Sequence, residues 1–145
     1  MRKILMPIDG SRYSRKAIDY AGNLGLLEGN DVHLIMVIQT GYASKYMDGD
    51  INFYPGQVIH PKEHAQEVMD KTVAAFKEKG LDVTAHTPIG DPAQMILETA
   101  KEIDADLIVI GNRGLGAFSR AFLGSVSTKV MNHARCSVLI VKEKD

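Results

Sequence analysis

One stretch of this 145-residue chain combines glycines with groups that attract anions. It begins with the sequence GNRG at residues 111–114, continues for nine residues and ends at Gly124-Ser125. Glycine lets the backbone approach a bound group closely and adopt a positive φ. The amides of a helix that starts near Ser125 would attract phosphate, and the hydroxyls of Ser125 and Ser127 can donate to its oxygens. The pattern therefore predicts a polyphosphate site.

The charge distribution favours the same part of the chain for an anion. From Leu107 to Val141 there is no Asp or Glu, whereas four basic residues contribute +4: Arg113, Arg120, Lys129 and Arg135. The other residues carry 13 basic and 18 acidic side chains, or −5, and the formal net charge of the whole chain is −1. Because a nucleic-acid binder usually has an excess of basic residues, we expect no nucleic acid as a partner.

Two better-known phosphate motifs do not fit this stretch. A Walker A loop requires a lysine after its second glycine, but Gly124 is followed by Ser125. A dinucleotide-binding fingerprint would follow the first strand, where this chain has only the turn DGS at residues 9–11. Residues 114–116 also lack the third glycine of that fingerprint. The alternative that stays open is a glycine-rich surface loop without a ligand.

The elements that must position this stretch follow from the hydrophobic pattern. Short apolar runs predict strands at Arg2–Ile8, Val32–Ile38, Leu81–Thr87, Leu107–Ile110 and Ser137–Val141. Helical spacing and capping residues predict helices after Ser11, from Pro61, after Asp91 and over Ser125–His133. The order βαβαβαβαβ predicts a single α/β domain over residues 1–145. Its sheet should be open, doubly wound, five-stranded and parallel, with helices on both faces.

Ligands bind such sheets at the carboxyl ends of the strands, which nominates the turns after Ile8, Ile38 and Ile110. The second of these turns opens the least regular segment, Gln39–His60. It holds four of the nine aromatic residues, Tyr42, Tyr46, Phe53 and Tyr54. These side chains could lid a ligand or dock a partner, but covering the segment's own helices is the simpler interpretation.

The glycine pattern resembles the nucleotide-binding signature of the universal stress protein family. The sequence PIDGS at residues 7–11, the sequence GDP at residues 90–92 and the hydrophobic last strand are also similar. The resemblance covers essentially the whole chain. It implies a Rossmann-like fold of the adenine nucleotide alpha hydrolase-like type, with strand order 3-2-1-4-5. The intact glycine signature resembles the ATP-binding branch of the family.

The resemblance also implies which residues bind a nucleotide. Asp9 would contact the adenosine portion beside Pro7 and Ile8, and Val37 would border the adenine. The residues implied for the ribose and phosphate side are Ile110, Gly111, Arg113 and Gly114, and those implied for the phosphates are Gly124, Ser125, Val126 and Ser127. Ile8 stands where the family commonly has Thr or Val, so only backbone contacts are expected there. From the residues alone, Asp9 can equally close a turn or cap a helix.

The cofactor implied by the resemblance is ATP, with a Mg²⁺ or Mn²⁺ ion. The ion would be held mainly by the phosphates, because no acidic cluster lies nearby in the sequence. The implied role is that of a nucleotide-dependent regulatory module in the stress response, whose downstream partner the sequence does not identify. A slow ATP hydrolase or phosphotransferase is an alternative, although only Asp9 or a residue of the long segment offers a base. A dimeric scaffold that ignores nucleotide is the third hypothesis.

The last strand predicts a homodimer. In the strand order expected for the family, Val138–Val141 forms a sheet edge, where unpaired backbone groups invite another strand. Its apolar side chains face both sides of the sheet, and charges follow only from Lys142 onward. We expect antiparallel pairing with a two-fold copy, because two-fold dimers are the commonest oligomers.

The composition also bears on the cellular compartment. The lone Cys136 excludes an intrachain disulfide and favours a reducing compartment, so we expect a cytoplasmic protein. The longest apolar runs, such as Leu107–Ile110, fall far short of the roughly 18 residues that span a bilayer. Polar and turn residues from Pro7 to Gly10 interrupt the first apolar stretch before it could form a signal-peptide core. We therefore expect neither a membrane span nor a cleaved leader.

The histidines support only a weak metal hypothesis. His60 and His64 are four residues apart near a helix start, which could place both on one face, but a solvated first turn explains them adequately. His33, His86 and His133 have no partner that the sequence makes recognisable. We accordingly predict no metal-binding side chain and no catalytic residue.

Overall fold

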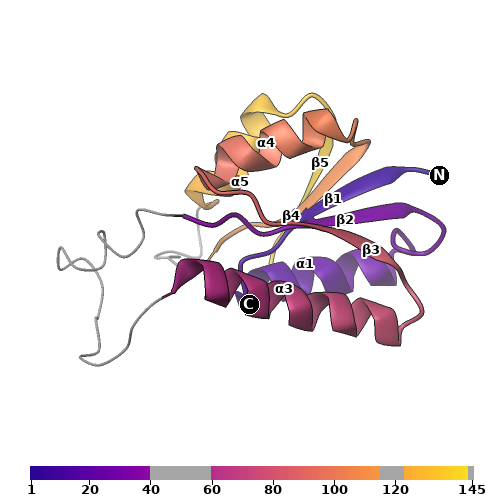
Figure 1. The fold of residues 1–145 in the computed structure, drawn as a ribbon. Coiled ribbons are helices and arrows are strands. Elements are labelled where there is room, and N and C mark those ends of the chain that lie inside the picture. Colours follow the sequence, from indigo (N-terminus) through magenta and orange to yellow (C-terminus); the bar gives the residue numbers. More distant parts are fainter. Residues whose placement is uncertain (40–59, 115–122, 144–145) are drawn as a thin grey trace.

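Five apolar segments of the sequence become the strands of one parallel sheet (Figure 1). The computed structural model describes residues 1–39, 60–114 and 123–143. Its strands are β1 (Lys3–Pro7), β2 (Asp31–Ile35), β3 (Val83–His86), β4 (Leu107–Gly111) and β5 (Ser137–Val141). They lie in the order β3-β2-β1-β4-β5, which confirms the predicted fold class and strand order.

Helices in the described part of the chain cover both faces of the sheet. They are α1 (Arg12–Asn23), α3 (Pro61–Glu78), α4 (Pro92–Glu102) and α5 (Ser125–His133). The first two lie on one face and the last two on the other (Figure 1). Two helix starts confirm predicted caps: the Ser11 hydroxyl accepts from the N–H of Ser14 at 3.3 Å, and Asp91 Oδ2 accepts from that of Gln94 at 3.0 Å. None of these helices is long and apolar enough to cross a membrane.

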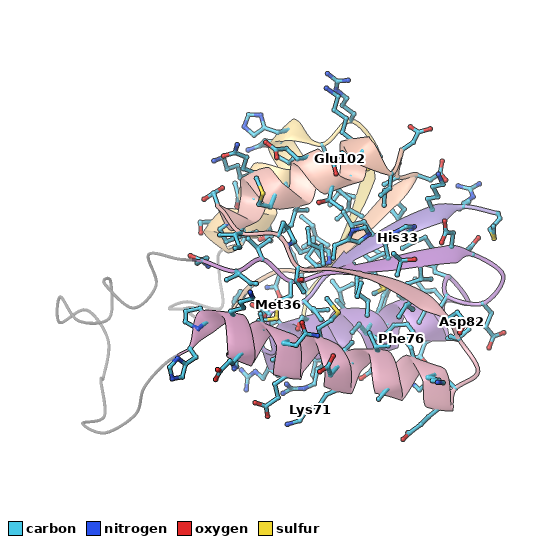
Figure 2. The ribbon with its side chains drawn as sticks, in the orientation of Figure 1. His33, Met36, Lys71, Phe76, Asp82 and Glu102 are labelled. Carbon is cyan, nitrogen blue, oxygen red and sulfur yellow. The ribbon has the colours of Figure 1, made fainter. Side chains whose placement is uncertain are left out.

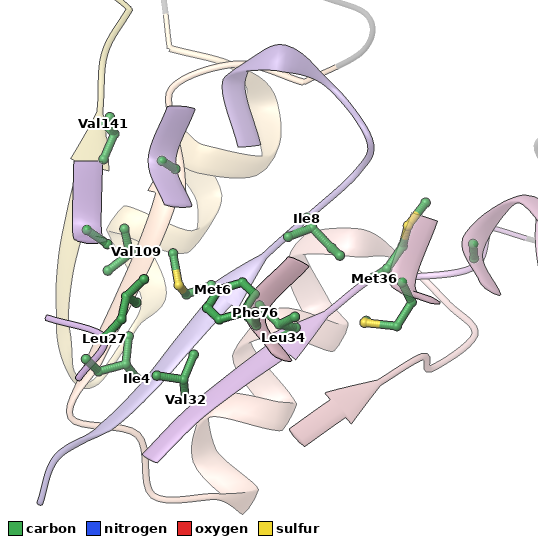
Figure 3. Close-up of a cluster of buried hydrophobic side chains, with 14 of the residues drawn as sticks. Ile4, Met6, Ile8, Leu27, Val32, Leu34, Met36, Phe76, Val109 and Val141 are labelled. Carbon is green, nitrogen blue, oxygen red and sulfur yellow. The ribbon is translucent and has the colours of Figure 1, made fainter. Parts of the chain in front are cut away.

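Alternate side chains of the strands point into two separate cores. On β1, Ile4 and Met6 pack toward α1 and α3, whereas Leu5 packs toward α4 and α5, and all three are fully buried. Figure 3 shows the first core, to which α3 contributes Phe76. Burying a side chain of this size contributes about 1.5–3 kcal/mol. A slip of one residue would exchange the two faces, so the cores hold the register that aligns the carboxyl ends of the strands.

β2 and β3 end earlier than the sequence predicts. The predicted strands Val32–Ile38 and Leu81–Thr87 are each longer than the observed ones, and pairing resumes only in an isolated bridge between Ile38 and Ile89. Pro88 accepts a hydrogen bond from the N–H of Ile38 at 2.8 Å. It has no N–H to donate in return, so the regular ladder ends before it.

Candidate functional site

At the carboxyl ends of β1 and β4, two glycines lie unusually close to other residues. A Cβ atom on Gly114 would lie 2.7 Å from Asp9 Oδ2, and one on Gly111 would lie 2.8 Å from the carbonyl oxygen of Tyr13. Real Cβ atoms essentially never approach other atoms this closely. The chain beyond β4 therefore passes directly against the turn after β1 and the first turn of α1.

Asp9 shapes this junction through both carboxylate oxygens. Its Oδ1 accepts a hydrogen bond from the N–H of Ser11 at 2.8 Å, which closes the turn in which Gly10 adopts a φ of 81°. Its Oδ2 faces Gly114 across the junction. The turn-closing role that the sequence left open is thus present, and one oxygen also lies beside the segment that follows β4.

The start of α5 is tied to the end of β4 by Asn112. The N–H of Gly124 donates to the Asn112 carbonyl at 2.7 Å. The Ser127 hydroxyl lies 3.0 Å from the carbonyl oxygens of both Asn112 and Gly124, and the side chain is buried. The hydroxyl predicted to reach a phosphate is therefore donating inside the protein in this structure, whereas Ser125 is exposed.

The first turn of α5 presents backbone amides without helical acceptors. The first hydrogen bond within the helix runs from the N–H of Thr128 to the carbonyl of Gly124, at 3.0 Å. The amides of Ser125, Val126 and Ser127 precede it and have no acceptor within the helix. Gly124, at the N-cap, has no side chain that could accept from them, and no acidic residue lies in this turn. Such a helix start favours an anion.

Beyond β4, Asn112 Oδ1 and Arg113 Nε are buried polar atoms that have no hydrogen-bond partner in the part of the chain that the structure describes. Most buried polar atoms in proteins are satisfied, so these two indicate a place where a bound polar group would find partners. Asn112 was absent from the predicted site residues. Its position inside the GNRG sequence is the signal that could have identified it.

A family model described as the universal stress protein family matches residues 1–142. A universal stress protein of Synechocystis sp. is 35% identical over 153 aligned residues, which cover 97% of each chain. This chain belongs to the universal stress protein family.

Solved structures share this universal stress protein fold. A universal stress protein family protein from Arabidopsis thaliana, crystallised with AMP bound, matches with a TM-score of 0.72 at 19% identity over 99% of this chain and 93% of that one. A universal stress protein in complex with cAMP matches with a TM-score of 0.69 at 23% identity, over 99% and 98%. At these identities the matches establish the common fold.

The family resemblance implies a set of site residues. Each of them lies at or just after the end of one of three strands, or at the start of one helix. They are Pro7, Ile8 and Asp9 at β1, Val37 after β2, Ile110, Gly111, Arg113 and Gly114 at β4, and Gly124, Ser125, Val126 and Ser127 at α5. Because β2, β1 and β4 are neighbours, these residues lie together at the edge of the sheet that is formed by the carboxyl ends of the strands. Arg120 and residues 40–59, with their aromatic side chains, lie outside the described residues.

The predicted histidine pair of this universal stress protein lies close to the same edge. His64 is exposed, and its Nε2 lies 4.0 Å from the position of a Cβ on Gly10. Within residues 1–39, 60–114 and 123–143, no three His, Cys, Asp or Glu side chains are grouped to hold a metal ion.

A cavity of about 350 Å³ opens at the opposite edge of the sheet, formed by the amino ends of the strands, where α4 and α5 end. Cys136 lines it, and burial raises the pKa of the thiol. A thiol with a raised pKa is a poor nucleophile at neutral pH. Cys136 packs against the core beneath α4 and α5, as the sequence predicts for a small apolar residue.

Sequence reasoning missed a second polar cluster on the α4 side of the sheet (Figure 2). His33 Nδ1 on β2 lies 2.9 Å from His86 Nε2 on β3, and the two rings stack with centroids 5.2 Å apart. His33 Nε2 lies 3.2 Å from Asp31 Oδ2. Burial lowers the pKa of His86, protonated His33 acts in the same direction, and Glu102 of α4 opposes them. This cluster links the two strands away from the candidate site.

Proposed function

We propose that this universal stress protein binds ATP at the carboxyl edge of β1, β2 and β4, with the phosphates on the first turn of α5. The observation that carries the proposal is the group of backbone amides at Ser125, Val126 and Ser127, which have no acceptor within α5, next to the buried Arg113 Nε, which has no hydrogen-bond partner among the described residues. Amides and a guanidinium are donors that suit phosphate oxygens. The AMP and cAMP bound to two structural relatives support an adenine nucleotide as the ligand.

The proposal assigns roles by position along the sheet edge. Asp9, beside Pro7 and Ile8, would contact the adenosine portion, and Val37 would border the adenine. Ile110, Gly111, Arg113 and Gly114 would line the ribose and phosphates, and Gly124, Ser125, Val126 and Ser127 would hold the phosphates. Since the Ser127 hydroxyl donates to backbone carbonyls, its contribution would come from its backbone N–H.

We propose that a Mg²⁺ or Mn²⁺ ion accompanies the triphosphate. The phosphate oxygens would supply most of its ligands, because the described residues offer no cluster of three metal-binding side chains. When bound, the ion would offset part of the phosphate charge.

The bound nucleotide would regulate the protein by changing its conformation. A ligand that binds one arrangement of the segment after β4 better than another shifts the protein toward that arrangement. We propose that this shift acts in the stress response and in the cytoplasm, where a lone cysteine stays reduced. Slow ATP hydrolysis is compatible with this role, because Asp9 places a carboxylate at the junction, beside Gly114.

The decisive experiment compares ATP affinity in wild type and Gly124→Val by titration calorimetry. A Cβ on Gly124 would lie 3.4 Å from both Arg113 Cα and the Asn112 carbonyl, at the tight end of ordinary contact, so the two further methyl groups of valine would crowd the start of α5. We expect ATP affinity to fall at least about tenfold, or 1.4 kcal/mol. Gly22→Val, an exposed glycine on α1 whose Cβ would meet its nearest neighbour at an ordinary 3.5 Å, is the matched control. Unchanged ATP affinity in folded Gly124→Val would contradict the placement.

We further propose a homodimer through Val138–Val141. β5 lies at the edge of the sheet, and its residues after the exposed Ser137 are half-buried or buried. An edge strand with apolar side chains on both faces favours pairing with another strand. Antiparallel pairing across a two-fold axis would satisfy the open backbone groups of both copies.

A further inference from the structure

Tyr13, in the first turn of α1, lies between two arginines that approach from different parts of the fold. Arg12 Nη2 donates to the Tyr13 hydroxyl at 3.2 Å, and the Arg12 Cζ lies 5.1 Å from the centre of the ring. Arg113 Cζ, from the segment after β4, lies 5.9 Å from the same ring. Guanidinium groups within about 6 Å of an aromatic ring are attracted to its face. The tyrosine ring therefore connects α1 to the candidate site.

The backbone of Tyr13 is fixed relative to the strand that carries Arg113. The carbonyl oxygen and Cβ of Tyr13 lie so close to Gly111 that a Cβ on Gly111 would meet them at 2.8 and 3.1 Å. The point at which the ring joins the backbone is therefore fixed relative to the end of β4. From this point the ring reaches Arg113, whose Cζ lies 5.9 Å from the ring centre.

The other arginine is anchored by the chain after β5. Arg12 Nε lies 3.2 Å from Glu143 Oε2, and Lys16 Nζ lies 3.3 Å from Glu143 Oε1. The charge of Arg12 is therefore compensated by Glu143. Among the described residues, no carboxylate lies within ion-pair distance of Arg113.

Arg113 also lies next to the start of α5. Its Cα is 3.4 Å from the position of a Cβ on Gly124, the residue that precedes the free amides. A long arginine side chain loses conformational freedom when it binds, and holding it in advance reduces that cost. A contact that restrains Arg113 beside these amides would therefore favour a phosphate-bearing ligand.

We propose that Tyr13 is a positioning residue that holds the Arg113 guanidinium ready for the phosphates of the bound nucleotide, while Arg12 and Glu143 fix the tyrosine ring. This inference rests on the proposed function and adds a determinant of phosphate selectivity to it. Hydrogen bonding from Arg12, followed by that from Arg113, lowers the pKa of Tyr13, which agrees with two cations at one phenol.

The test measures the affinities of wild type and Tyr13→Leu for ATP and for adenosine by calorimetry. Loss of a cation–π contact of this kind predicts ATP binding weaker by about threefold. Adenosine, which has no phosphate, should bind equally well to both proteins. Tyr13→Phe keeps the ring and should retain most of the ATP affinity. Tyr20→Leu, an exposed tyrosine at the other end of α1, is the matched control.

A double-mutant cycle separates positioning from a general structural effect. In an Arg113→Met background, Tyr13→Leu should cause no further loss of ATP affinity, because the side chain it positions is gone. Equal losses in the two backgrounds would overturn the positioning role, and so would equal losses for ATP and adenosine.

A spectroscopic readout needs no nucleotide and covers the case in which a leucine variant does not fold. The difference in ultraviolet absorbance between wild type and Tyr13→Phe during a pH titration reports the ionisation of Tyr13. Arg113→Met should raise the pKa of Tyr13, because one of the two cations that lower it is removed. If Arg113→Met leaves the pKa of Tyr13 unchanged, the proposed contact between Tyr13 and Arg113 is overturned. If wild type fails to bind ATP while the titration moves, the proposed function and the positioning role are overturned but the contact stands.

Discussion

The β4–β5 half of the sheet and the β2–β3 half have the same architecture but differ in what surrounds their buried polar groups. Beyond β4, Asn112 and Arg113 each hold a buried polar atom without a hydrogen-bond partner among the described residues, beside helix amides that have no acceptor within α5. Between β2 and β3, ring nitrogens of His33 and His86 meet at 2.9 Å, and the other nitrogen of His33, which also lacks a hydrogen bond, faces the Asp31 carboxylate at 3.2 Å. A buried donor without a partner gains by binding an acceptor. Beyond β4 such a donor lies beside a helix N-terminus, which favours an anion there, whereas the two histidines join neighbouring strands.

The two edges of the sheet repeat this contrast. Along β5, the residues from Val138 to Val141 are apolar and half-buried or buried. Along β3, Thr84 and Ala85 are exposed, and the strand ends at His86. An apolar edge favours a partner strand, while a polar, exposed edge is stable in water. Each of the following changes tests whether a half behaves as this comparison predicts.

The largest effect is expected at the β5 edge. Ile140→Lys should abolish the proposed homodimer, because the substitution buries an unpaired charge at the contact. Light scattering at micromolar protein concentration measures the change in mass. Thr84→Lys places the same side chain on the β3 edge and should leave the dimer intact. A wild-type monomer at this concentration would contradict the dimer, and a folded Ile140→Lys dimer would contradict this interface.

The next effect concerns the close packing between β4 and α1. Gly111→Ala should destabilise the protein by about 1–3 kcal/mol, because the added Cβ overlaps the backbone of Tyr13 and either the helix or the strand must shift. Gly22→Ala, on the exposed side of α1, should stabilise it by about 0.5–1 kcal/mol. Urea unfolding of the three proteins gives both values. Equal stability of wild type and Gly111→Ala would show that β4 and α1 are less tightly packed than described.

The smallest effect belongs to the β2–β3 half and depends on pH. The pKa of His86 is lowered in the folded protein, so the unfolded chain, with an ordinary pKa of about 6.5, takes up a proton first. The free energy of unfolding should therefore be highest above about pH 6.5 and should fall as the pH drops below it. In His86→Phe this fall should be smaller, although the variant loses the hydrogen bond to His33.

Urea unfolding at about pH 7.5 and pH 5 measures that fall, and comparing the two proteins cancels the other titrating groups. His133→Phe changes an exposed histidine of α5 and serves as the control, with the wild-type response expected. If His86→Phe loses as much stability on acidification as wild type, His86 is not the group responsible.

Several features of this protein could be predicted from local sequence. The caps at Ser11 and Asp91 were predictable because a capping side chain bonds to a backbone N–H three residues away. The sheet was predictable because apolar strands that alternate with amphipathic helices have few ways to bury both faces. The position of the glycine signature at the end of β4 follows from the same alternation. In each case the interacting groups are neighbours in the chain, or the pattern repeats along it.

The tertiary structure decided the contacts between residues that are distant in the chain. His33 and His86 are 53 residues apart, and only the pairing of β2 with β3 brings their rings together. Tyr13 meets Arg113 because β4 lies beside β1, and Glu143 reaches Arg12 because β5 follows β4 in the sheet. The sequence does not show which hydrogen-bond donor will meet which acceptor. Strand order and register choose that partner, and these depend on the burial of the whole sheet rather than on any one segment.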